Sequence, residues 1–153
     1  VPIEGVLHMA EAVRVDFAYS QMGTTGQLGG GFRALQCRFD RCKYQSSLDG
    51  VFEHCTFLAS NLADSTIREA FADCDFTNAN MTRIRGSQVT FRGCTFVSTN
   101  FVKACLYDCR FIDCRFHGTK FGCGSLAGSV FTDCELVGID WKDTILDRVA
   151  GVM

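Results

Sequence analysis

The chain has 153 residues, 47% of them hydrophobic, and its 15 Lys and Arg nearly balance its 17 Asp and Glu. This length favours one domain with a substantial core over two independent domains, and the lack of a Lys/Arg-rich run argues against nucleic-acid binding. No apolar run approaches the roughly 20 residues that span a bilayer, and the amino end lacks the pattern of a secretory signal. The composition therefore indicates a soluble domain without a nucleic-acid partner or a membrane span.

Residues 1–31 are expected to form an N-terminal cap. Apolar residues recur at helical spacing within 3–13 and predict a short amphipathic helix that covers one end of the core. The glycine-rich segment 23–32, GTTGQLGGGF, is unsuited to a regular element and is expected to be a loop.

A large apolar residue then recurs every five positions. The pattern begins around Phe39 and Tyr44, continues in a shifted frame from Phe52 to Ile67, and is regular from Phe71 onward. An insertion is expected between Tyr44 and Phe52, and the frame slips by one residue after Ile67. The large positions of the regular part are Phe71, Phe76, Met81, Gly86, Phe91, Phe96, Phe101, Leu106, Phe111, Phe116, Phe121, Leu126, Phe131, Leu136, Trp141 and Leu146.

A small or β-branched residue stands two positions before each large one, as Cys74 does before Phe76. No α-helix repeats a face at a strict five-residue spacing, and a plain strand alternates every two. Two inward residues on an extended segment, followed by a turn, describe one side of a square. Four sides make a coil of about 20 residues, so equivalent positions stack at a strand spacing of about 4.8 Å.

This pattern resembles the pentapeptide-repeat family over about 37–148. The resemblance implies an all-β solenoid, a right-handed quadrilateral β-helix of about five to six coils, over residues 32–148 with a tail at 149–153. Gly86 departs from the pattern because it lacks the large side chain. We expect the unusually large Ile84 of the same repeat unit to fill that volume.

The cysteines form the most conspicuous column. Cys55, Cys74, Cys94, Cys114 and Cys134 occupy the small inward position of one side, each followed two residues later by a large one, which is Phe57, Phe76, Phe96 or Phe116 in the first four cases. Their spacing is unlike the paired cysteines of zinc sites. Thiols enclosed by phenylalanine rings are also expected to have raised pKa values and low reactivity. We therefore interpret the column as core filling and expect no metal and no cofactor.

Other polar pairs are weaker candidates. Cys114 and His117 have metal-ligand spacing, but Cys114 is expected to face inward and His117 outward, and His54 is separated from Cys55 in the same way. Cys105 and Cys123 fall on outward positions and are the possible surface thiols. Asn61, Asn80 and Asn100 stack on one side, where an amide ladder between coils is preferred over a binding strip.

With every inward position filled, no interior cleft remains for a substrate, so an enzyme is not expected. The leading hypothesis is a non-catalytic protein-binding or scaffold module, such as an accessory subunit of a larger assembly, with another protein as partner and a homodimer through the C-terminal coil as a further option. The alternative comes from the resemblance: some members mimic DNA and bind type II topoisomerases, protecting them from inhibitors. Residues 71–150 hold nine acidic and nine basic side chains, and this balance disfavours DNA mimicry.

The compartment stays open. Reduced, buried cysteines favour the cytoplasm, whereas the family also has members in the thylakoid lumen. The chain begins at Val1, which fits either a processed organellar protein or a trimmed chain.

Overall fold

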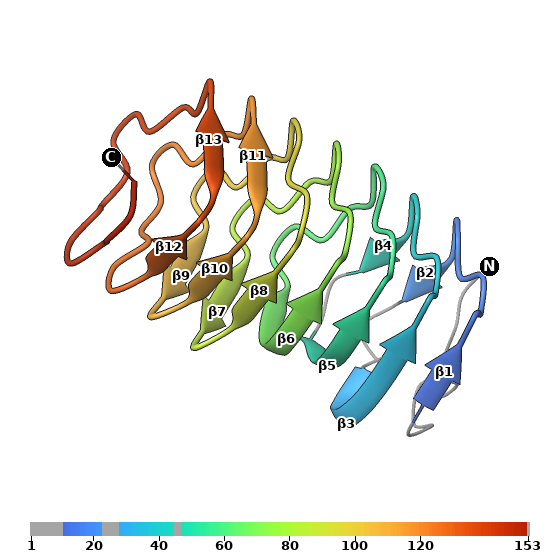
Figure 1. Ribbon diagram of the computed structural model, residues 1–153. Coiled ribbons are helices and arrows are strands. Elements are labelled where there is room, and N and C mark those ends of the chain that lie inside the picture. The colour runs from blue at the N-terminus through green and yellow to red at the C-terminus, as the bar shows by residue number, and fades with distance from the viewer. Residues whose placement is uncertain (1–10, 23–27, 45–46, 153) are drawn as a thin grey trace.

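The computed structural model describes residues 11–22, 28–44 and 47–152. The chain winds as a solenoid of short parallel strands, with Glu11–Val13 and Glu135–Val137 near opposite ends of the stack (Figure 1). Within these ranges there are no helices, and hence none long and apolar enough to cross a membrane. The predicted quadrilateral β-helix is confirmed.

Thirteen strands are formed in the described ranges. Their bounds are β1 Glu11–Val13, β2 Gln21–Met22, β3 Leu28–Leu35, β4 Lys43–Tyr44, β5 Ser47–Glu53, β6 Thr66–Ala72, β7 Arg85–Ser87, β8 Thr90–Arg92, β9 Cys105–Tyr107, β10 Arg110–Ile112, β11 Arg115–His117, β12 Val130–Thr132 and β13 Glu135–Val137.

The first face of the solenoid is a continuous parallel ladder. It runs in the order β1, β3, β5, β6, β8, β10 and β12, and its register places Phe52, Phe71, Phe91, Phe111 and Phe131 directly above one another. Because side chains alternate in a strand, each phenylalanine points inward and its two neighbours point outward.

The other three faces are held by shorter pairings. The second face carries the bridge from Thr56 through Asp75 and Thr95 to β11 and β13. On the third face, β2 and β4 are continued by a bridge from Asn61 through Asn80 to Asn100. The fourth face is formed by the first halves of β5 and β6 together with β7 and β9.

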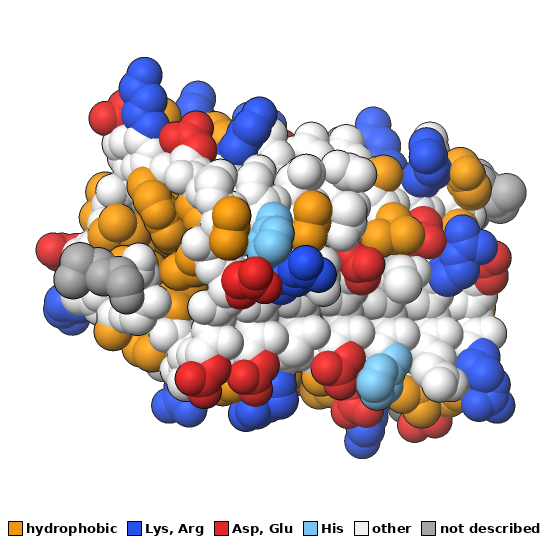
Figure 2. Space-filling view, turned by 45° about the horizontal axis from the view of Figure 1, so that its top comes forward, with side chains coloured by type: hydrophobic (Ala, Val, Ile, Leu, Met, Phe, Trp, Pro, Cys, Tyr) orange, Lys and Arg blue, Asp and Glu red, His pale blue; other side chains and the backbone are white. Residues whose placement is uncertain are grey.

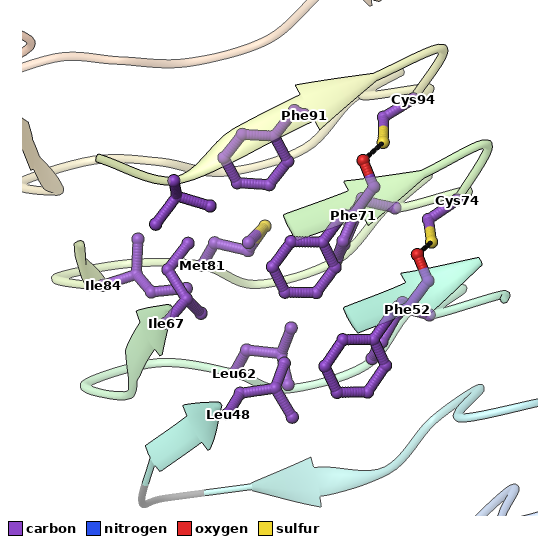
Figure 3. Packing of buried hydrophobic residues seen from close by; sticks show 14 of the residues in the cluster. Leu48, Phe52, Leu62, Ile67, Phe71, Cys74, Met81, Ile84, Phe91 and Cys94 are labelled. Carbon is purple, nitrogen blue, oxygen red and sulfur yellow. Dashed lines mark hydrogen bonds between the residues drawn. The ribbon is translucent and has the colours of Figure 1, made fainter. Parts of the chain in front are cut away.

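Stacked aromatic rings fill the interior. Phe71 lies 5.0 Å from Phe52 and 5.2 Å from Phe91, with interplanar angles of 8° and 10°. Phe76 of the second face meets Phe71 edge-on at 5.5 Å. Figure 3 shows the stack of Phe52, Phe71 and Phe91, with aliphatic side chains of the third and fourth faces, such as Leu62 and Ile67, beside it. Offset-stacked and edge-on rings are the favourable aromatic geometries, and the same arrangement can therefore be repeated in successive coils.

Residues with a positive φ, in the left-handed region, form the corners of each coil. Asp73, Asp113 and Asp133 each have a φ of 53° at the corner between the first and second faces, and Gly93 has a φ of 64° at the same corner. Aspartate and asparagine tolerate this conformation better than most residues, and glycine tolerates it without strain. The outward residues of each repeat unit therefore determine where the chain turns.

The N-terminal expectations are wrong where the structure describes them. Glu11–Val13, the end of the predicted helix, is strand β1 and pairs with β3. Leu28–Leu35 is also a strand, so the predicted loop does not include residues 28–32. Pairing with neighbouring strands makes both segments extended, although the apolar spacing of the first predicts a helix and the glycine content of the second predicts a loop. The solenoid therefore includes residue 11. Residues 3–10 and 23–27 lie outside the described ranges.

At the other end, the expected tail at 149–153 is joined to the last coil. Ala150 bridges to Val130, and the N–H of Val149 donates to the carbonyl of Leu146. Val149 and Val152 pack against the core.

The two interruptions of the five-residue spacing, between Tyr44 and Phe52 and after Ile67, have a common cause. Leu48 is buried and pairs with Ile67, so Tyr44, Leu48 and Phe52 are successive large positions only four residues apart. The expected insertion is therefore wrong, because each of these two sides is one residue short. In β5 and β6 the strand continues from the fourth face into the first, with Glu69 of β6 at the corner with a φ of 70°, whereas in the next coil a turn at Gln88 separates β7 from β8.

Candidate functional site

The cysteine column lies along the inner side of the first corner. Cys55, Cys74, Cys94 and Cys114 are at most 2% exposed, and Cys134, in the last coil, is half-buried. Each thiol donates to the carbonyl of a residue in the preceding coil: Cys74 to Phe52 at 3.4 Å, Cys94 to Phe71 at 3.4 Å and Cys114 to Phe91 at 3.3 Å. Figure 3 shows the first two of these bonds.

Hydroxyl groups play the same role on other sides. Thr99 donates to Phe76 at 2.7 Å, Thr119 to Phe96 at 2.6 Å, and Ser129 to Leu106 at 3.0 Å, again one coil back. Sequence reasoning missed this function of the small position. The available signal was the frequency of Cys, Ser and Thr there, since all three combine a small volume with a hydrogen-bond donor.

Burial makes these thiols poor nucleophiles. It raises the pKa of Cys42 and of Cys109 to about 11 and that of Cys94 well above its usual value. The contact of Cys134 with the Cys114 thiol, together with burial, raises the pKa of Cys134 as well. Because the thiolate is the reactive and metal-binding form, the thiols of Cys94 and Cys134 are expected to react slowly near neutral pH.

The histidine candidates are separated from the cysteines. Cys114 is buried, whereas His117 is on the second face, with Nε2 3.1 Å from Oε1 of Glu135. His54 is likewise outside, 3.8 Å from Asp73. Across the residues the structure describes, no group of three or more His, Cys, Asp or Glu side chains is arranged to hold a metal ion.

The two predicted surface thiols are Cys105, which is partly exposed, and Cys123, which is exposed. All ten cysteines are free. Cys105 begins β9 on the fourth face, and Cys123 occupies the corner between the third and fourth faces with a φ of 60°.

The asparagine side chains form hydrogen bonds within their own coil and do not form a ladder between coils. Oδ1 of Asn61 accepts from the N–H of Ala63, and Oδ1 of Asn80 accepts from both the N–H and the hydroxyl of Thr82. Oδ1 of Asn100 accepts from the N–H of Val102. The amide-ladder prediction is therefore wrong for these oxygens, which close Asx turns at the corner that follows.

A groove on the fourth face was not predicted. It has a volume of about 710 Å³ and crosses β6, β7 and β9, with Arg68, Glu69, Arg85, Gln88, Cys105 and Tyr107 around it. We call it the fourth-face groove. Its floor includes Gly86, where an added Cβ would lie 2.9 Å from Cγ1 of Ile67 and 3.2 Å from Cδ2 of Leu106. The volume missing at Gly86 is thus filled from the coils on either side, and Ile84 is not among the nearest contacts.

The last coil leaves apolar side chains partly uncovered. Leu136, Trp141 and Leu146 occupy large positions but are only partly buried, whereas Phe116 and Leu106, their counterparts one or two coils earlier, are fully buried. Hydrophobic side chains gather at this end of the molecule, at the left of Figure 2.

Comparison with known proteins agrees with this geometry. Residues 84–150 match the family model described as pentapeptide repeat region. Two trypsin-treated variants of QnrB1, a plasmid-mediated fluoroquinolone resistance protein, share 16% and 17% identity with the chain; each alignment covers 99% of this chain and 87% of QnrB1, with TM-scores of 0.59 and 0.50. A pentapeptide repeat protein, Rfr23, from the cyanobacterium Cyanothece 51142 is 11% identical over 94% of this chain and 86% of its own, with a TM-score of 0.34.

At these identities the likeness to QnrB1 concerns the fold alone. No curated protein sequence matches the chain.

Proposed function

We propose that the chain, which has the fold of pentapeptide-repeat proteins, is a non-catalytic protein-binding or scaffold module, acting as an accessory subunit of a larger assembly. The observation that carries this proposal is the contrast between the inside and the outside of each coil. Inward positions repeat the same few residue types, whereas outward positions differ from coil to coil, as Thr66, Arg85 and Cys105 do on the fourth face. Recognition of a partner is therefore assigned to the outer faces.

Chemistry inside the solenoid is not part of this proposal. The interior is packed with aromatic and aliphatic side chains from Phe17 to Phe131, and burial raises the pKa of the inward Cys94 thiol well above its usual value. A repeat protein of this kind works by presenting a stiff surface to another macromolecule.

We place a second contact at the C-terminal coil, where a second copy of the chain covers Leu136, Trp141 and Leu146. Among the described residues, strand β13 pairs only with β11, and its other edge could pair with a second copy in a two-fold arrangement. Light scattering is expected to give the mass of a dimer for the wild type and of a monomer for Trp141→Arg. Tyr19→Arg, near the opposite end, is the control that should remain dimeric, and a monomeric wild type would contradict this contact.

The second candidate is topoisomerase binding, which the fold shared with QnrB1 suggests. The surface charge argues against DNA mimicry, because residues 71–150 hold nine acidic and nine basic side chains and blue and red side chains are interspersed on the face shown in Figure 2. An inhibitor-protection assay with a type II topoisomerase distinguishes topoisomerase binding from the scaffold function. Protection would favour this candidate, and no effect at saturating protein would remove it.

The protein-binding proposal is tested by affinity capture of the tagged chain from an extract of its source organism. A partner recovered in constant ratio supports the proposal. A chain that elutes as a single species, without any other protein, contradicts it.

A further inference from the structure

We propose that the fourth-face groove binds an acidic peptide segment of a partner protein, with Arg68 and Arg85 receiving carboxylates and Tyr107 packing against an apolar side chain. This inference rests on the proposed function, because it names the surface and the chemistry through which a protein partner is recognised.

The groove lies where the repeat is irregular. Strand β6 continues from the fourth face into the first around a corner at Glu69, with a φ of 70°, whereas the next coil interrupts the strand with a turn at Gln88, with a φ of 59°. The register differs between these coils: Ile67 pairs with Gly86, but Ala70 pairs with Thr90, so the later coil holds one more residue between the paired positions. The groove lies over this irregular side, and Gly86 is among its lining residues.

The side is one residue short in β6, and Gly86 replaces the large residue of the repeat. Glu69, with a φ of 70°, is the corner residue here, as Gln88 is in the next coil. Places where a sequence breaks its own structural rule are those where function is expected. Here the short side and the glycine both border one groove.

Two guanidinium groups give the groove its charge preference. The Arg68 side chain is 62% exposed, and its only ion pair in the described structure is with Asp49 at 3.8 Å. Arg85 has no ion pair within the described ranges, and the nearby carboxylate of Asp64 is already held by Arg83 at 2.6 and 2.9 Å. Arginine is well suited to binding carboxylates through paired hydrogen bonds.

Tyr107 supplies the apolar contact. It is 43% exposed, one of the few large exposed hydrophobic side chains, and it lines the groove together with Ile67. An aromatic ring with a polar tip, beside arginine, is typical of the residues that contribute most to protein interfaces.

A peptide fits this site better than a nucleic acid does. Phosphate-backbone binding relies on a row of basic side chains, whereas the carboxylates of Glu69, Asp49 and Asp64 lie in or beside the groove. A peptide can place its acidic side chains at the two arginines alone.

The test uses the whole chain panned against a display library of random peptides, with Arg68→Gln/Arg85→Gln as the variant. Arg110→Gln, an exposed arginine of the first face, is the matched control. We expect enriched peptides to be rich in Asp and Glu, to bind wild type and control at least about tenfold more tightly than the double variant, and to weaken with added salt. Lack of acidic enrichment, equal binding to the double variant, or no enrichment at all would overturn the proposal.

Cysteine protection gives an independent readout. A bound peptide should slow alkylation of Cys105, which lines the groove, without slowing alkylation of Cys123, which does not. Equal rates at Cys105 with and without peptide contradict the site. A single-stranded oligonucleotide that binds the wild type and is lost in the double variant would also contradict the peptide assignment.

Failure of this inference is distinguishable from failure of the proposed function. If affinity capture recovers the same partner with wild type and double variant, the protein-binding function stands and the groove assignment is wrong. If capture recovers no partner while acidic peptides still bind at the groove, the function proposal is the one contradicted.

Discussion

The thiol of Cys94 donates to the carbonyl oxygen of Phe71, 3.4 Å away and one coil earlier. The small inward residue, two positions before each large one, therefore links neighbouring coils as well as filling space in the core. The bond recurs at Cys74 and Cys114 and, with a hydroxyl in place of the thiol, at Thr119 and Ser129. The cysteine column is thus a hydrogen-bonding and packing element of the core.

Thr119→Val tests that link. The change keeps the side-chain shape and removes the hydroxyl that bonds to Phe96 at 2.6 Å. A net buried hydrogen bond contributes about 1 kcal/mol, so the free energy of unfolding in denaturant should fall by about that amount. The control is Thr95→Val on the outer second face, expected within about 0.5 kcal/mol of wild type. Equal effects of the two changes would contradict the role assigned to the inward hydroxyl.

The position of a large residue along the solenoid should set its contribution to stability. Leu106 and Leu146 occupy the same inward column, but Leu106 is fully buried in the middle and Leu146 is partly exposed at the end. Leu106→Ala is expected to destabilise by about 2–5 kcal/mol and Leu146→Ala by less than half as much. Denaturant unfolding compares the two, and an equal loss would show that the last coil is covered in solution.

Restoring the repeat at Gly86 should destabilise the protein. A side chain there meets Ile67 and Leu106, so Gly86→Leu is expected to cost about 1–3 kcal/mol through overpacking. Combining it with Ile67→Ala should cost less than the two single changes together, because the second change makes room for the first. Stabilisation by Gly86→Leu alone would mean that the volume is empty.

Alkaline pH should weaken the fold. An unfolded chain loses its thiol protons near pH 9.0, whereas the folded chain keeps those of Cys42 and Cys109 up to about 11. The stability from these thiols is therefore complete below pH 9 and is lost as pH rises through 11, at about 1.4 kcal/mol per pH unit for each thiol. Cys109→Ser should reduce the slope of unfolding free energy against pH. An unchanged slope would exclude Cys109 as a contributor.

Thiol reactivity should divide the cysteines into two groups. Alkylation of the native protein followed by mass spectrometry is expected to modify Cys105 and Cys123 first. Cys134 is partly exposed, but its raised pKa should keep it slow together with the buried cysteines. Rapid modification of Cys74 or Cys94 would contradict their inward placement.

The sequence predicts the regular part of this fold well because one repeat unit carries all the local information. Phe91 and Cys94, for example, have the same neighbours as Phe111 and Cys114. The N-terminal coils are harder to predict because Glu11–Val13 lies in a stretch with helical apolar spacing and Leu28–Leu35 in a glycine-rich stretch, so the local pattern does not reveal their strand pairing.

The groove was missed for a related reason. Arg68, Arg85 and Tyr107 come from three different coils, and they meet over the side of β6 that is one residue short. The frame slip after Ile67 and the glycine at position 86 are signs of this irregularity in the sequence, but neither alone predicts a groove. Only the register between coils places them side by side.

The most direct test of the central claim, that recognition lies on the outside of an inert solenoid, is quantitative affinity capture with three forms of the chain. Wild type and the interior variant Thr119→Val should recover the same partner in the same ratio, and Arg68→Gln/Arg85→Gln should lose it. Capture of no partner by folded wild-type protein, or loss of the partner on the interior change alone while the fold persists, would contradict the claim.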